Sequence, residues 1–143
     1  MGQTDIVKLL LDAGADVNAK GGNYGFAIQA ASYHGKKNIV KLLLDAGAQT
    51  DNGDNRNPAL HMAAIEGHGK SVELLIATGA DVNSQFQDKT AFQYVLSDWP
   101  EGKNGKKDMV ALLLDKGADI SMFSSEETAV IREIVPSGNL CTI

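Results

Sequence analysis

The apolar and polar positions of this chain repeat as one phrase. The stretch Ile6–Asn18 reads Ile-Val-Lys-Leu-Leu-Leu-Asp-Ala-Gly-Ala-Asp-Val-Asn, and it returns with small changes at Ile39, Val72 and Val110. The glycine of its Gly-Ala pair recurs at positions 14, 47, 79 and 117, so the spacings are 33, 32 and 38 residues. A period in this range is typical of solenoids built from small stacked units.

Within each unit the apolar spacing predicts two short helices and a loop. The second helix is clearest in residues 39–46, where Ile39, Leu42, Leu43 and Ala46 follow the i, i+3, i+4, i+7 rule. Gly47 is expected to end this helix because a residue without Cβ adopts the left-handed conformation at low cost. Another glycine stands twelve residues before each Gly-Ala glycine, and we expect it to mark the turn between the helices: Gly2, Gly35, Gly67 and Gly105.

Short alanine-rich segments precede these turns. Residues 27–32 and 59–64 carry small side chains that allow a neighbouring helix to approach closely, so they predict the first helix of their units. Polar stretches rich in Gly and Asn separate the units, for example Lys20–Gly25 and Asp51–Asn57, in which Asn52-Gly53 is a strong turn signal.

These phrases resemble the ankyrin repeat. Pro58–His68 is similar to the family's Thr-Pro-Leu-His and Gly-His signatures, and Gly79–Asn83 matches its Gly-Ala-Asp-Val-Asn signature. The resemblance covers nearly the whole chain and implies an all-α solenoid of stacked helix-turn-helix units with β-turn loops. Gly22–Ser32 is further similar to a variant abundant in fungal ankyrin proteins, in which such arrays often follow a NACHT-type nucleotide-triphosphatase module.

The resemblance implies a single domain of residues 1–143 that is divided into repeat units. We expect a partial repeat at 1–20, repeats at 21–52 and 53–84, a repeat at 85–121 with an insertion near 99–104, and a partial repeat or C-terminal cap at 122–143. The chain opens in a second helix without its first, which leaves an apolar face uncovered. Ser124–Glu127 offers a capping box for a helix over 128–135 that Pro136 stops.

Two departures from the repeat pattern carry structural expectations. His61 alone stands at the family's structural histidine position, and Pro58 replaces the threonine that would accompany it. Ser71 places a hydroxyl where the other units carry longer apolar side chains: Ile6, Ile39 and Met109. Unless this hydroxyl bonds to a backbone carbonyl, its burial costs stability.

Composition and charge exclude several classes of protein. With 143 residues, of which 43% are hydrophobic and 22% charged, the chain can bury one elongated core. A net charge of −5 disfavours nucleic-acid binding. Its one cysteine, Cys141, excludes an internal disulfide framework. No apolar run predicts a signal peptide or membrane contact, so an intracellular, cytoplasmic location is the default expectation.

One segment imitates a phosphate-binding loop. Ala64–Ser71 ends in Gly-Lys-Ser, and Val110–Asp115 resembles the strand and aspartate that hold magnesium in nucleotide-triphosphatases. That chemistry needs a strand feeding a glycine-rich loop that opens a helix. Here Ala64 ends a predicted helix and Gly67 is the ordinary turn glycine of the repeat, so we expect no nucleotide cofactor.

No other catalytic or metal-binding pattern stands out. His34, His61 and His68 fall in different structural roles, and no pair of His, Cys or carboxylate residues has metal-ligand spacing. The carboxylates recur at loop and helix-end positions of the repeat, which solvated surfaces explain. We therefore expect a non-enzymatic chain without catalytic residues, cofactor or metal.

What remains is a binding surface on the concave face that loop tips and first helices form in ankyrin-like arrays. Large apolar groups, polar groups and an arginine vary among the units there, and aromatic anchors with arginine are common hot spots of protein interfaces. The expected partner-binding residues are Asn23, Tyr24, Tyr33, His34, Asn55, Arg56, Asn57, Ile65, Glu66, Phe86, Gln87, Lys89, Asp98 and Trp99. For Trp99, packing of the insertion is an equal alternative.

Two functional hypotheses follow. The first is a non-catalytic module that binds a protein partner of unknown identity through the concave surface. The second is a structural or regulatory segment of a longer ankyrin array attached to a catalytic or nucleotide-triphosphatase domain outside this chain. Under the second hypothesis, the half-repeats at the two ends stack on further units, and the isolated chain self-associates through them.

Overall fold

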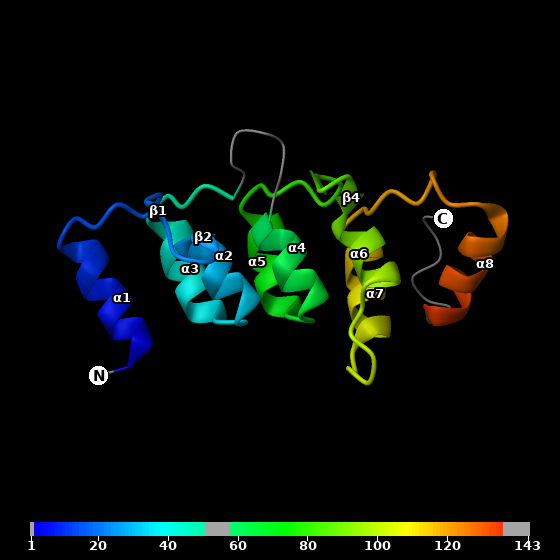
Figure 1. Cartoon of the computed structure of the whole chain (residues 1–143), viewed down its shortest axis with the longest axis horizontal. Coiled ribbons are helices and arrows are strands. Elements are labelled where there is room, and N and C mark those ends of the chain that lie inside the picture. Colours follow the sequence, from blue (N-terminus) through cyan, green and yellow to red (C-terminus); the bar gives the residue numbers. More distant parts are fainter. Residues whose placement is uncertain (1, 51–57, 136–143) are drawn as a thin grey trace.

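The computed structural model describes residues 2–50 and 58–135 and confirms an all-α solenoid of stacked helical units (Figure 1). The helices are α1 (Gln3–Asp12), α2 (Ala27–Tyr33), α3 (Lys37–Asp45), α4 (Pro58–Ile65), α5 (Gly69–Ala77), α6 (Ala91–Ser97), α7 (Lys106–Asp115) and α8 (Ser125–Ile134). The strands are β1 (Lys20–Gly21), β2 (Gly25–Phe26), β3 (Gln85–Phe86) and β4 (Lys89–Thr90).

Helices pack mainly against their own partner and the equivalent helix of the next unit. First helices form one row, in which α2 packs on α4 and α4 on α6, and second helices form another, in which α1 packs on α3 and α3 on α5. Alanines at the contacts allow the close approach that the sequence predicts, because Ala59, Ala63 and Ala91 are fully buried. The result is one continuous core along the row of units.

The loops between units lie along one edge of the row, where Figure 1 labels β1 and β4. Two of these loops close as antiparallel hairpins of two-residue strands, β1 with β2 and β3 with β4. Gln87 and Asp88 form the β3–β4 turn with φ of 50° and 65°. Both residues are therefore left-handed, as a type I′ hairpin turn requires, although neither is glycine. Asn52-Gly53 lies outside the described residues.

The turns between helices also follow the prediction. Gly47 ends α3 with φ 88°, and the corresponding glycines 14, 79 and 117 are left-handed as well. Gly35, with φ 63°, has a second role, because an added Cβ would lie 2.5 Å from the ring of His68 in the next unit. His68 Nε2 also lies 2.9 Å from the Tyr33 carbonyl oxygen, so this turn residue joins two units.

Asparagine side chains link units at the hairpin edge. The side-chain amide of Asn18 donates to the Gly47 carbonyl at 3.2 Å, and its side-chain oxygen accepts a hydrogen bond from the backbone N–H of Gln49 at 2.8 Å. Asn83 makes the same two bonds two interfaces further along, with the Gly117 carbonyl at 3.1 Å and the Asp119 backbone amide at 2.7 Å. The Asn of the Gly-Ala-Asp-Val-Asn phrase thus fixes the spacing of neighbouring loops.

The insertion extends the turn between α6 and α7 at the edge opposite the hairpins (Figure 1). Half-buried Trp99 packs against the core, and its indole N–H donates to the Lys103 carbonyl at 2.9 Å. The Lys103 ammonium lies 5.7 Å from the centre of the Trp99 ring and pairs with Glu66 at 2.7 Å. Trp99 also faces Gly67, whose absent Cβ would be 3.2 Å from the ring. The insertion therefore clamps the third and fourth units together.

The last helix departs from the first helices before it. Its predicted capping box is confirmed, because the Ser124 hydroxyl accepts the Glu127 amide and the Glu127 carboxylate accepts the Ser124 amide. Glu126 is the second residue of its helix, as buried Ile28 is in α2 and Phe92 in α6, but it is exposed. Ile131 anchors α8 to the core instead.

Ser71 is 1% exposed, and its hydroxyl has no hydrogen-bond partner among the described residues. The backbone bond that would offset its burial is not formed. We expect Ser71→Ala to raise the free energy of unfolding by about 1 kcal/mol, because a buried unpaired hydroxyl loses its hydration without compensation. Urea denaturation measures the change. Ser97→Ala is the control, since the Ser97 hydroxyl is exposed and donates to the Gln93 carbonyl; an equal gain there would contradict this explanation.

We expect Trp99→Ala to lower the free energy of unfolding by about 2 kcal/mol, because it removes a half-buried ring that packs between two units. The same urea experiment, followed by circular dichroism, measures the loss. Lys107→Ala on the exposed side of α7 is the matched control and should change little. A Trp99→Ala chain as stable as the parent would show that the insertion does not clamp the units.

Candidate functional site

Most of the residues expected to bind a partner lie on the hairpins and first helices. Tyr24 and Asn23 lie between β1 and β2, while Phe86, Gln87 and Lys89 belong to the β3–β4 hairpin. The first helices contribute residues at or just after their C-terminal ends: Tyr33, His34, Ile65, Glu66 and Asp98. Asn55, Arg56 and Asn57 lie outside the described residues. We call the surface made by these hairpins and the outer sides of α2, α4 and α6 the hairpin surface.

An aromatic cluster lies on the second unit. The ring centres of Tyr24 and Tyr33 are 5.1 Å apart, and His34 is 5.4 Å from Tyr24 and 5.1 Å from Tyr33. Both contacts of His34 are edge-to-face, at 76° and 86°. Such pairs are more stable than their buried area alone would give. The hairpin and the end of α2 therefore hold one another through three rings, of which Tyr33 and His34 remain exposed.

A second aromatic cluster joins the third and fourth units. Phe86 on β3 lies 5.8 Å from the ring of His61 on α4, and Tyr94 on α6 lies 5.7 Å from His61 and 6.4 Å from Phe86. The Lys89 ammonium stands 5.2 Å from the centre of the Tyr94 ring. The Tyr94 hydroxyl donates to the Gln87 side chain at 3.4 Å. The β3–β4 hairpin thus leans on the first helices of two units.

A cation lies between this cluster and the end of α6. Lys89 donates to Asp98 at 2.7 Å and to the Ser97 hydroxyl at 3.2 Å. Hydrogen bonds from Lys89 and then from Ser97 hold the pKa of the Asp98 carboxyl below its ordinary value. Both side chains are exposed to solvent, so the pair orients Lys89 along α6 and contributes little to stability.

His61 is buried at 3% exposure, and its Nε2 lies 3.1 Å from the Lys89 carbonyl oxygen. This contact agrees with the structural role that the sequence predicts for His61, even with Pro58 in place of threonine. His61 also contacts the β3–β4 hairpin through the Lys89 carbonyl and the Phe86 ring, and the sequence pattern alone does not reveal these contacts.

Sequence reasoning missed Tyr94. Its position holds Ala30 in α2 and Met62 in α4, so it varies among the units just as the expected residues do. That variation is the signal that could have identified it.

Two expected residues lie away from the hairpins. Trp99 and Glu66 meet at the opposite edge of the row, where Lys103 contacts both of them. Their contacts are those of the packed insertion, which is the alternative that the sequence leaves open for Trp99. Tyr24, Tyr33 and His34 form one group. Phe86, Gln87, Lys89 and Asp98 form another around Tyr94.

The imitation of a phosphate-binding loop lies in a helical turn. Residues 64–71 run from the end of α4 through the turn to the start of α5, so a helix and not a strand leads into them. Lys70 pairs with Glu73 at 3.0 Å on the surface of α5. Within residues 2–50 and 58–135, no three His, Cys, Asp or Glu side chains gather as a metal site would need. Across the same part of the chain, no helix has the length and apolar character to cross a bilayer.

Comparison with known proteins agrees with this architecture. The family model described as "Ankyrin repeats (3 copies)" matches residues 1–86. The chain is also 35% identical over 127 residues to the protein described as "Ankyrin repeat domain-containing protein SAT10" of Stachybotrys chartarum. That alignment covers 87% of this chain and 6% of the relative, so the chain corresponds to a small part of that protein.

Ankyrin repeats are generally protein-interaction modules and generally non-catalytic. The family model covers more than half of the chain. Helix pairs recur in the second, third and fourth units, and a left-handed glycine follows the second helix of each of the four units. The chain belongs to the ankyrin-repeat family.

Proposed function

We propose that this chain is a non-catalytic module that binds a protein partner through the hairpin surface. The observation that carries the proposal is the pair of aromatic clusters, one of Tyr24, Tyr33 and His34 and the other of His61, Phe86 and Tyr94. Partly exposed aromatic rings provide a large contact area with few rotatable bonds, and they are enriched among the residues that dominate binding energy.

The rings are held in place before a partner arrives. Tyr24 is fixed between Tyr33 and His34, and Phe86 rests on the buried ring of His61. A surface that is already ordered loses less conformational entropy on binding, so more of the contact energy appears as affinity. Polar groups beside the rings, such as Asn23, Gln87 and the Lys89–Asp98 pair, supply hydrogen bonds that select the partner.

A second candidate function is that of a segment within a longer array. The relative of Stachybotrys chartarum continues far beyond the aligned region, which is 6% of its length. In this chain α1 exposes large apolar side chains, Ile6, Leu9 and Leu10, as a unit without its neighbour would. A catalytic or nucleotide-triphosphatase domain elsewhere in a longer protein belongs to this second proposal.

We expect Tyr33→Ala and Tyr94→Ala each to weaken binding to the partner by about tenfold or more, because a hot-spot residue contributes more than about 1.4 kcal/mol. Cross-linking and mass spectrometry first identify the partner, and titration calorimetry then compares the purified variants. Circular dichroism should show unchanged helical content.

Lys41→Ala is the matched control, since Lys41 is exposed on α3 in the row of second helices. Partner affinity that Tyr33→Ala and Tyr94→Ala leave unchanged, or that Lys41→Ala reduces equally, would contradict binding through the hairpin surface. Trp99→Ala separates the two interpretations of the insertion. A loss of stability without loss of affinity for the partner would assign Trp99 to packing alone.

A further inference from the structure

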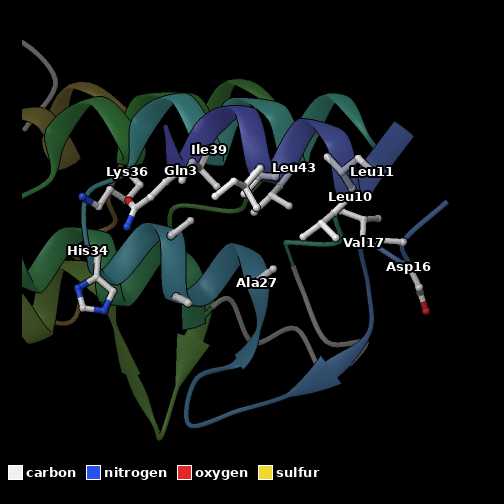
Figure 2. Close-up of a pocket in the computed structure, with 15 residues that line it drawn as sticks. Gln3, Leu10, Leu11, Asp16, Val17, Ala27, His34, Lys36, Ile39 and Leu43 are labelled. Carbon is white, nitrogen blue, oxygen red and sulfur yellow. The ribbon is translucent and has the colours of Figure 1, made fainter. Parts of the chain in front are cut away.

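An apolar groove of about 640 Å³ lies at the N-terminal end of the row, between α1 and α2 (Figure 2). Its walls are apolar side chains of α1, the following loop and α3, and its floor is alanine from α2. Figure 2 shows Leu10, Leu11 and Val17 toward one end and His34 and Lys36 at the other. The apolar lining residues are Ile6, Val7, Leu10, Leu11, Ala15, Val17, Ala27, Ala30, Ala31, Ile39 and Leu43.

The groove exposes positions that are buried in the other units. Leu10 is 56% exposed, whereas its equivalents Leu43, Leu75 and Leu113 are at most 3% exposed. Ile6 is 45% exposed, while Met109 at the same repeat position is 3% exposed. Leu10 and Ile6 therefore stand at core positions whose equivalents in the other units are covered by neighbouring helices.

The floor of the groove identifies what closes that core. Ala27 on α2 is exposed, whereas its equivalents Ala59 on α4 and Ala91 on α6 are fully buried. Since α2 packs on α4 and α4 packs on α6, those two alanines have the first helix of the preceding unit beside them. The groove exposes on α2 the same side that α4 and α6 pack against the preceding first helix. A first helix would therefore fill it.

The first helices of this chain define the chemistry of that neighbour. In α2 and α4, a large aliphatic residue is buried near the start of the helix, an amide or imidazole follows it, and a small residue is buried three positions later. The residues are Ile28, Gln29 and Ser32 in α2, and Leu60, His61 and Ala64 in α4. The exposed α8 does not fit this pattern, because Glu126 would bring a carboxylate to the aliphatic position. A second copy that docked through α8 would bury that charge without a partner.

We propose that the groove between α1 and α2 is a docking site for one short α-helix of this first-helix type. The proposal deepens the second candidate function, that of an array segment, and rests on it. The helix covers Ile6 and Leu10 of α1 and the alanine face of α2, in the place that α2 itself takes beside α4.

The exposure of Leu9 distinguishes a single docked helix from a complete neighbouring unit. Leu9 is 55% exposed but does not line the groove. At the same repeat position, Leu112 of α7 approaches Gly69 of α5, where an added Cβ would be 3.5 Å from the leucine side chain. Position 9 therefore faces the second helix of a preceding unit. A first helix in the groove buries Leu10 and leaves Leu9 open.

Thiol labelling tests the site in the full chain. Cys141→Ser removes the one native thiol, and Leu10→Cys or Leu9→Cys introduces a new one at an exposed position. Each variant is compared with the same chain extended before Gly2 by a copy of residues 58–66, which supplies a first helix. Because thiol reactivity follows exposure, we expect the extension to slow maleimide labelling of Leu10→Cys by at least about tenfold. Leu9→Cys should change by less than about twofold.

The matched control carries the same extension with aspartate in its copy of Leu60. This extension has equal length but cannot bury its aliphatic position, so labelling of Leu10→Cys should stay fast. Equal labelling of Leu10→Cys with and without the native extension would overturn the proposal, as would equal protection by the aspartate extension. Protection that grows with protein concentration in the unextended chain would assign the groove to a second copy instead. No partner protein takes part in this assay, so its failure would leave binding by the hairpin surface untouched.

Discussion

Contact between neighbouring first helices is the interaction on which the rest of this molecule depends. A helix as short as α2 or α6 is marginal alone in water, because nucleation costs more than seven residues return in hydrogen bonds. Alanines at the contact bring α2, α4 and α6 close enough to share one core. Stability in such arrays is a sum over units and the interfaces between them, so each unit is only as ordered as its neighbours allow.

The fold could be predicted from the sequence because the same physical requirement recurs in every unit. A left-handed glycine ends each second helix, as at Gly47, and a buried leucine such as Leu75 returns at the same repeat position. Ser71 was identifiable as an anomaly for the same reason. The β3–β4 hairpin was harder to predict, since its turn requires a left-handed conformation at Gln87, which glutamine does not favour, although Asp88 suits the same turn.

The candidate site was only partly visible in the sequence. Variation among units pointed to Tyr24, Tyr33 and Phe86, because residues outside the core are free to differ. Which of these residues meet depends on how each hairpin folds back on the first helices, and no repeat pattern encodes that geometry. Tyr94 escaped notice because it stands in the middle of a first helix, beside the apolar residues Val95 and Leu96. Trp99 could not be assigned, since an insertion has no equivalent in the other units to compare with.

The two surfaces of this chain are connected through the second unit. His34 lies at one end of the N-terminal groove and also contacts the rings of Tyr24 and Tyr33. The helix α2 carries the alanine floor of the groove on one side and ends at this aromatic cluster. Because terminal units of a solenoid have one interface fewer, they open first, and the cluster loses its support when they do. A helix in the groove gives α2 its second neighbour. On these two proposals, we expect a helix in the groove to order the part of the hairpin surface around Tyr33 and so to favour binding of a partner there.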